Sequence, residues 1–256
     1  MTVATEHTPR NKRPVLNIGI MIVLALAVLG AVVVANSWKK GLVVKDISTR
    51  GNKILTSSEI VSTAGIEKGQ KLYSMNLDAA RKRVESNPYV LTASLVRDVP
   101  GRVTIVVQER VPIALLHADR HVLIDSAGII LPEVKEGKVF DLPFLTGVTL
   151  SPDCKPGTTI HSAPVREALS LLSGAQRVSD DLFHRISEVH VASDGELLCY
   201  TSESGVPVMF GQGSIPEKLA KFDSFWKQEV DREGVQTLQY VDLRFEDQVV
   251  ARWNQQ

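Results

Sequence analysis

The sequence has little of what metal, redox or nucleic-acid chemistry requires. Its two cysteines, Cys154 and Cys199, stand in unrelated contexts and form no C-x-x-C pair, so a zinc or thioredoxin-like site is unsupported. We interpret both as unpaired or buried thiols and keep a disulfide as the alternative. Lysine plus arginine and aspartate plus glutamate number 29 each, so no general excess of positive charge is present to bind nucleic acid.

The motifs of the common enzyme classes are also missing. No G-x-S-x-G, H-E-x-x-H or Walker loop occurs. Ser-x-x-Lys matches begin at Ser37 and Ser224, but the other elements of a penicillin-binding enzyme are absent. We therefore interpret the two lysines as a membrane flank and a solvated helix face. The sequence predicts no catalytic residue and no enzyme.

Two weaker patterns resemble ligand sites. Residues 211–216 (GQGSIP) contain two glycines of a nucleotide-binding loop but lack the third, and we interpret them as a tight turn before a helix. The histidines have no metal-ligand spacing. The closest pair, His117 and His121, lies four residues apart on one strand-like segment, and we interpret both as surface residues. No cofactor and no metal are expected.

A long apolar run is present near the N-terminus. Residues 15–35 carry no charge over 21 positions, and 13 of them are Val, Leu or Ile. As a helix the run spans roughly 31 Å, close to the thickness of the hydrocarbon layer. At about −0.3 to −0.6 kcal/mol each, these 13 residues favour insertion by about 4 to 8 kcal/mol. The run predicts a transmembrane helix over residues 15–36.

The basic residues Arg10, Lys12 and Arg13 before this run also suit a cleaved signal peptide. The run is longer than the apolar core of about 7–15 residues in such peptides, so a signal anchor is the better interpretation. We expect a cytoplasmic tail over residues 1–14, a short linker over 39–42, and the bulk of the chain outside the cytoplasm. This orientation follows from a short tail preceding a long exported part.

Residues 42–110 predict a small α+β module of order β-α-α-β-β. Thr56 and Glu59 have the spacing of a capping box, and Gly65 is placed to end that helix. Asn76 is placed to cap a second helix. Two alternating segments around a Val-Pro-Gly turn then predict a hairpin.

Residues 111–256 predict a mixed-sheet β domain with flanking helices. A helix is expected to start at Ser162, and three short strands follow around SDG and ESG turns. Ser214 and Glu217 have the spacing of another capping box, with apolar residues repeating at helical intervals after it.

The last strand-like segment carries the strongest functional signal. Residues 240–253 (YVDLRFEDQVVARW) predict two strands around a tight Glu-Asp turn. Side chains alternate between the two faces of the second strand. One face carries Val249, Ala251 and Trp253, and the other carries Val250 and Arg252. A strand at a sheet edge exposes unpaired backbone groups that accept an incoming strand. The alternative interpretation is that this strand lies in the interior of the sheet and that both Phe245 and Trp253 belong to the core.

The chain resembles the FtsQ/DivIB family of bacterial cell-division proteins. The resemblance rests on VKDISTRGNKILTSSEIVSTAGIEKGQKLYSMNLDAARKRVESNPYV, on ERVPIALLHADRHVLIDSAGIIL and on YVDLRFEDQVVARW, with GQGSIPEKLAKFDSF as a further similar tract. It implies a membrane span, a POTRA module, a C-terminal β domain and a non-catalytic scaffold role at the septum in the cell inner membrane. It also implies binding to FtsB, FtsL and other membrane proteins of the division complex, with FtsB adding a strand to the C-terminal sheet edge.

Site residues are carried over from the family position by position. Phe245 stands where the family often has Tyr, Trp253 keeps its aromatic character, and Arg244 matches an arginine. Asp247 and Gln248 replace a Ser-Gly turn seen in some members. The partner-binding residues implied are Arg244, Phe245, Asp247, Gln248, Val249, Val250, Ala251, Arg252 and Trp253. A POTRA-bearing chaperone or secretion component that binds extended polypeptides is the alternative function.

Overall fold

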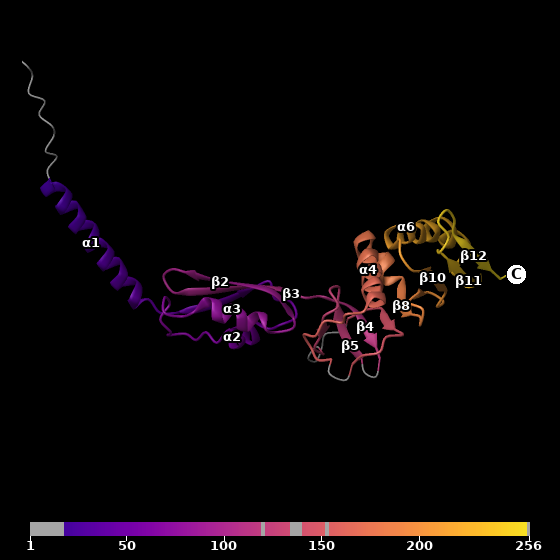
Figure 1. Ribbon diagram of the computed structural model, residues 1–256, viewed down its shortest axis with the longest axis horizontal. Coiled ribbons are helices and arrows are strands. Elements are labelled where there is room, and N and C mark those ends of the chain that lie inside the picture. The colour runs from indigo at the N-terminus through magenta and orange to yellow at the C-terminus, as the bar shows by residue number, and fades with distance from the viewer. Residues whose placement is uncertain (1–17, 119–120, 134–139, 152–153, 255–256) are drawn as a thin grey trace, which may run out of the picture.

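The computed structural model describes residues 18–254, except 119–120, 134–139 and 152–153. The expected tail over residues 1–14, with its basic residues, lies outside the described residues. Figure 1 shows an elongated molecule in which an N-terminal helix, a small α+β module and a larger sheet-containing body follow one another. The C-terminal strands lie at the end of the molecule far from the N-terminal helix (Figure 1).

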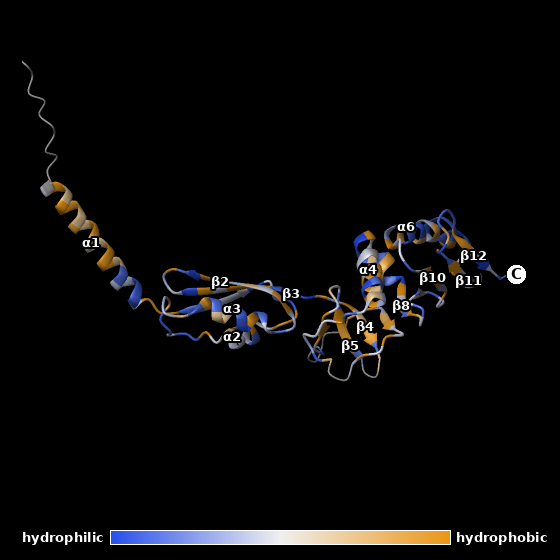
Figure 2. Ribbon diagram, viewed as in Figure 1, coloured by the Kyte–Doolittle hydropathy of each residue, from blue (hydrophilic) through white to orange (hydrophobic). Residues whose placement is uncertain are grey.

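Helix α1, Ile18–Gly41, is long and apolar enough in its Gly19–Gly41 part to cross a membrane. Its described apolar side chains are exposed all round, and Figure 2 shows the apolar colour giving way to polar residues at its C-terminal end. A helix that is apolar on every side requires an apolar surrounding such as lipid. The expected linker over residues 39–42 is wrong in part, because the helix continues through Gly41. No Pro or Gly interrupts residues 31–40, so nothing ends the helix earlier.

The small module has the predicted element order. Its elements are β1 Asp46–Arg50, α2 Ser57–Ala64, α3 Leu77–Glu85, β2 Val90–Asp98 and β3 Arg102–Glu109. The sheet order is β1-β3-β2, with β1 parallel to β3 and β2 antiparallel to it. Three alternate residues of β3 are buried in the core of this module: Val103, Ile105 and Val107.

The predicted caps of this module are confirmed. Thr56 Oγ1 accepts from the Glu59 backbone N–H at 3.2 Å, and the Glu59 carboxylate accepts from the Thr56 N–H at 2.9 Å. Gly65 ends the helix in the left-handed conformation, and Asn76 Oδ1 accepts from the Ala79 N–H at 3.0 Å. Local sequence signals fix these helix ends because each cap satisfies backbone groups within a few residues.

The larger body is built on one mixed sheet. Within the described residues its strand order is β12-β11-β10-β9-β8-β7-β4-β5-β6. The strands are β4 Pro112–His117, β5 His121–Asp125, β6 Ile130–Leu131, β7 Phe144–Thr146, β8 Ile186–Val191, β9 Leu197–Thr201, β10 Pro207–Gly211, β11 Leu238–Asp242 and β12 Val250–Trp253.

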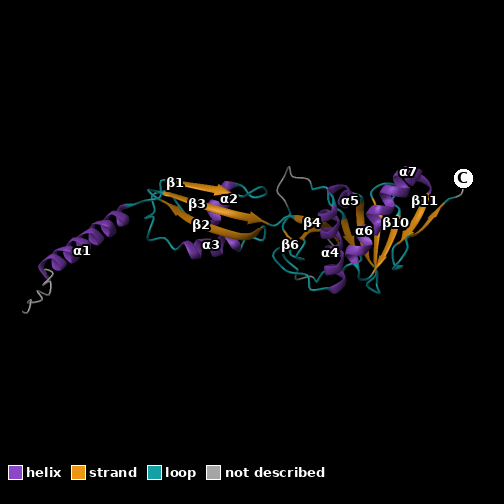
Figure 3. Ribbon diagram, turned by 90° about the horizontal axis from the view of Figure 1, so that it is seen from above, coloured by secondary structure: helices purple, strands orange, loops and turns teal. Residues whose placement is uncertain are grey.

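Helices cover one face of this sheet (Figure 3). They are α4 Ala163–Val178, α5 Asp180–His184, α6 Ile215–Phe225 with a π-helical continuation Trp226–Val230, and α7 Asp231–Glu233, followed by a short 3-10 turn Val235–Thr237. Behind the C-terminal strands the core is aromatic. The rings of Phe210 and Phe222 are 5.9 Å apart, those of Phe222 and Trp226 are 5.5 Å apart, and the Arg185 guanidinium lies 4.9 Å from the Trp226 ring. Such edge contacts stabilise beyond the area they bury.

The predicted capping box of Ser214 and Glu217 does not form. Ser214 has a φ of 52°, and its side chain caps no backbone group of α6. An N-cap residue needs extended backbone, and the left-handed turn before α6 denies it that conformation. The Glu167 carboxylate, from α4, instead accepts from the Gly213 N–H. A carboxylate of the chain itself thus accepts from the backbone N–H of the glycine-rich turn.

The histidine pair is arranged differently from the expectation. His117 lies on β4 and His121 on β5, opposite one another in the hairpin register, with ring centroids 4.5 Å apart. Both are exposed. Among the described residues, no group of three or more potential ligands gathers around a metal position. Of the cysteines, Cys199 is a buried thiol whose pKa is raised by burial, while Cys154 is half-buried.

Candidate functional site

Strand β12 ends the larger sheet. It pairs antiparallel with β11, with Tyr240 opposite Arg252, Val241 opposite Ala251 and Asp242 opposite Val250. Within the described residues no strand pairs with its other flank, so the interior-strand alternative does not hold. The unpaired flank faces outward at the C-terminal end of the molecule (Figures 1 and 3).

The backbone of β12 points its groups alternately toward and away from β11. The Asn254 N–H donates to the Thr237 carbonyl at 2.7 Å, so position 254 faces the sheet. Because backbone direction alternates along a strand, Arg252 and Val250 also face β11, whereas Ala251 and Trp253 direct their N–H and C=O groups outward. These two residues offer the hydrogen bonds that an added strand would use.

The predicted pair of strands around a tight turn is wrong in its boundaries. Strand β11 ends at Asp242, and the chain regains strand pairing only at Val250. Asp242 Oδ1 accepts from the Arg244 N–H at 3.0 Å, which turns the backbone away from the ladder. Five of the expected site residues therefore lie in the connecting loop, namely Arg244, Phe245, Asp247, Gln248 and Val249.

The loop is held on α6 rather than open. Lys221 Nζ donates to the Phe245 carbonyl at 3.0 Å and also to the Glu246 carbonyl. The side chain of Phe245 stays 47% exposed, and those of Asp247 and Gln248 are exposed beside it. The loop that leads into β12 thus presents an aromatic ring to solvent.

The two faces of β12 follow the predicted alternation. Val249, Ala251 and Trp253 pack against the core, while Arg252 is exposed on the other face with half-buried Val250. The Trp253 ring lies 5.8 Å from that of Phe225. Its Nε1 is buried and has no hydrogen-bond partner among the described residues. The two aromatics that the sequence treats as a pair are therefore divided, with Phe245 outward and Trp253 inward.

A groove of about 460 Å³ lies beside this edge, between α6 with its π-helical continuation and the start of β12. Phe225 and Val249 supply apolar surface in it, and Lys221 and Glu229 supply charge. No sequence pattern predicts this groove. The spacing of Lys221 and Phe225 at i and i+4 on α6 places them on one face, but only the fold brings Val249 to that face.

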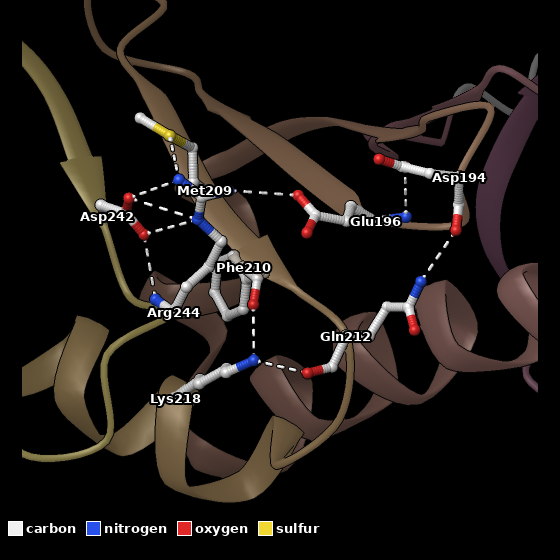
Figure 4. Close-up of polar contacts among 8 residues, drawn as sticks. All are labelled: Asp194, Glu196, Met209, Phe210, Gln212, Lys218, Asp242 and Arg244. Carbon is white, nitrogen blue, oxygen red and sulfur yellow. Dashed lines mark hydrogen bonds and ion pairs between the residues drawn. The ribbon is translucent and has the colours of Figure 1, made fainter.

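Arg244 forms the centre of a polar network, shown in Figure 4. Its guanidinium donates to Asp242 from Nε at 3.0 Å and from Nη2 at 2.8 Å, and from Nη1 to Glu196 at 3.3 Å. These hydrogen bonds from Arg244 lower the pKa of the Asp242 carboxyl below its usual value and raise that of the guanidinium. Because its charge is already paired with Asp242 and Glu196, the main role of Arg244 is to hold the loop in place within the protein.

A buried lysine completes the network (Figure 4). Lys218 Nζ donates to the carbonyls of Phe210 at 2.6 Å and Gln212 at 2.7 Å, which fixes the turn from β10 into α6. Burial lowers the pKa of this ammonium group. Gly211 lies in the same turn with a φ of 64°, and a Cβ there would come within 2.9 Å of Arg244 Cγ. The network therefore sets the position of the loop that leads to β12.

Comparison with protein families gives two matches. Residues 42–110 match the model described as "POTRA domain, FtsQ-type", and residues 113–244 match that described as "Cell division protein FtsQ/DivIB, C-terminal". The second match ends at Arg244, so positions 245–253 lie beyond it.

Individual relatives agree with these matches. A protein of Rhodothermus marinus named "Cell division protein FtsQ" is 30% identical over 259 residues, covering 97% of this chain and 92% of the relative. One of the same name from Geotalea daltonii is 24% identical over 200 residues, covering 78% and 72%. A "Cell division protein DivIB" from Clostridium acetobutylicum is 30% identical over 118 residues, covering 46% and 47%.

Proposed function

The chain belongs to the FtsQ/DivIB family of cell division proteins, and from this membership we propose that it is a non-catalytic scaffold that binds a partner by strand addition at β12. Its single described apolar helix and its relatives' names mark it as a single-pass membrane protein of the division machinery. We further propose that the tail is cytoplasmic, that the bulk is periplasmic, and that the partner strand comes from FtsB, with FtsL in the same assembly.

The observation that carries the proposal is the unpaired flank of β12. Natural sheets usually protect such an edge, and the exposed charge on β12 is Arg252, on the face opposite the core. An added strand would bond to the outward backbone groups of Ala251 and Trp253. Main-chain bonds of this kind give affinity that depends little on sequence.

Specificity has a separate source in the groove beside the edge. Phe225 and Val249 suit an apolar side chain, and Lys221 and Glu229 can pair with charges that flank it. Exposed Phe245, in the loop that leads into β12, can add an aromatic contact, as aromatic anchors do in many interfaces. Together these features suit a partner segment that alternates apolar and charged residues.

A proline scan of β12 tests strand addition. Ala251→Pro removes an N–H that points outward, so the internal ladder keeps its bonds and the fold is preserved. We expect this variant of the full chain to bind purified FtsB–FtsL complex at least about tenfold more weakly, a loss of about 1.4 kcal/mol, with a nearly unchanged melting temperature.

The matched control is Arg252→Pro, one residue away. It removes an N–H that faces β11, so we expect a lower melting temperature in the partner's absence. Unweakened binding by a folded Ala251→Pro protein would overturn strand addition at this edge.

A further inference from the structure

A second cavity lies where α1 meets the small module, far from β12. It measures about 520 Å³ and is lined by Asn36, Lys39, Lys40, Lys71, Tyr73 and Ser74. Three of these side chains are lysines, and the lining contains no acidic residue. The three lysines come from two separate segments, the last turn of α1 and the loop before α3, so the fold has brought them together.

The loop that supplies Lys71 is held by backbone hydrogen bonds to the segment that directly follows α1, residues 42–44. Leu72 N–H donates to the Leu42 carbonyl at 2.8 Å, and Val44 N–H donates to the Gln70 carbonyl at 2.9 Å. Arg97 holds the loop from the other side, donating to the carbonyls of Leu72 at 2.8 Å and Met75 at 2.7 Å. These bonds fix the backbone that carries Lys71 beside the segment that follows Lys39 and Lys40, although the three lysine side chains themselves are exposed.

Tyr73 forms an aromatic wall of this cavity. The Lys39 ammonium lies 5.9 Å from the ring centroid and the Arg97 guanidinium lies 5.8 Å from it. Tyr73 is 41% exposed, so part of its surface stays accessible to a ligand beside the two cations. Cation–π contacts of this kind position the charges without neutralising them, because the ring carries no net charge.

The cavity lies at a defined depth relative to the membrane. Lys39 and Lys40 follow the last residue of the apolar run, Ala35, by four and five positions. At 1.5 Å per residue these positions are roughly 6–8 Å beyond the hydrocarbon edge, which is the level of lipid headgroups. Trp38 is exposed at the same level, as expected of an interfacial aromatic.

We propose that this cavity binds the phosphate group of an anionic phospholipid in the leaflet on which the small module rests. Clustered lysines whose described surroundings in the cavity include no acidic residue favour an anion, and the nearest phosphates to the end of a membrane-spanning helix are those of lipid headgroups. Binding holds the module against the membrane and fixes the direction in which the rest of the chain leaves it. This inference does not depend on strand addition at β12.

The test is native mass spectrometry of the full chain released from mixed micelles of phosphatidylglycerol and phosphatidylcholine. We expect the wild type to retain phosphatidylglycerol preferentially, and the triple variant Lys39→Gln, Lys40→Gln, Lys71→Gln to lose that preference at least about tenfold. Each lysine near an anionic surface contributes roughly fivefold. The matched control replaces exposed lysines elsewhere, Lys82→Gln, Lys155→Gln and Lys227→Gln, and should keep the preference.

Two further arms separate the explanations. Lys71→Gln with Glu67→Gln keeps the wild-type net charge, so lost preference in this variant supports a defined cavity, whereas full preference would mean diffuse attraction and overturn the proposal. Glycerol 1-phosphate at millimolar concentration should displace little of the bound lipid. Complete displacement would assign the cavity to soluble phosphate esters instead and overturn the lipid source.

Discussion

At the residue scale, the position of the β11–β12 loop depends on a few polar and glycine residues. Arg244 spans Asp242 and Glu196, and it passes directly over Gly211. None of these residues is expected to bond to a partner backbone. They matter because they decide where the chain leaves β11, and hence where β12 and exposed Phe245 lie.

The Gly211→Ala substitution should be among the more destabilising single changes in this region. The residue has a left-handed φ, and its new Cβ would come within 2.9 Å of Arg244 Cγ. We expect a loss of about 1–3 kcal/mol in the free energy of unfolding, measured by urea denaturation. Gly205→Ala is the matched control, because its φ of 59° is similar and no atom lies within 4 Å of the new Cβ. Equal losses in both variants would show that contact with Arg244 contributes nothing.

The Asp242 carboxyl should make stability depend on acid pH. Its pKa is lowered in the folded protein by hydrogen bonds from Arg244, so the unfolded chain binds its proton more readily. The stabilisation is fully present above the ordinary carboxyl pKa of 3.8 and is lost as the pH falls through the lower folded value. In thermal melts from pH 2 to 6, Asp242→Asn should therefore show a shallower rise in melting temperature than wild type. Parallel curves would contradict this role.

At the scale of elements, features that depend on a few neighbouring residues could be predicted from the sequence more fully than features that depend on the tertiary fold. The Thr56–Glu59 capping box forms because all its atoms lie within one helical turn. The same pattern at Ser214 and Glu217 fails because the glycine-rich turn and the Glu167 carboxylate from α4 decide that helix start. The alternation of β12 was predictable, since it follows from strand geometry. Its groove was not, because Lys221 and Val249 meet only through the tertiary fold.

The division of the two aromatics gives the test at this scale. Phe245→Ala should leave the melting temperature nearly unchanged and weaken FtsB–FtsL binding by about 2 kcal/mol or more, as loss of an exposed anchor does. Trp253→Ala should instead lower the free energy of unfolding by about 1–3 kcal/mol, because the indole packs on Phe225 and the core. Denaturation and a pull-down on the same samples separate the effects. A stable Trp253→Ala protein that loses binding would place this ring in the interface.

At the scale of the whole molecule, the junction between the small module and the sheet-containing body sets how far β12 lies from the membrane helix. Two polar contacts among the described residues lie at this junction. The Tyr89 hydroxyl donates to the Pro132 carbonyl at 2.6 Å, and Arg110 pairs with the buried carboxylate of Asp125 at 2.9 Å. Burial raises the pKa of Tyr89 to about 12, so the phenol stays a neutral donor at physiological pH. The junction is therefore a specific joint rather than a loose linker.

Removing that hydroxyl should loosen the joint without unfolding either part. Tyr89→Phe deletes one hydrogen bond worth about 1 kcal/mol while keeping the buried ring. Spin labels can be placed at the exposed positions of Lys82 and Lys227. The distances between them, measured by double electron–electron resonance, should then show a broader distribution than in wild type. Tyr73→Phe, at the membrane end of the small module, is the matched control and should leave the distribution unchanged. Because β12 lies beyond the joint from α1, broadening with intact binding of FtsB–FtsL would show that the joint orients the edge and does not build it. An unchanged distribution in Tyr89→Phe would mean that this hydrogen bond does not fix the orientation of the two parts.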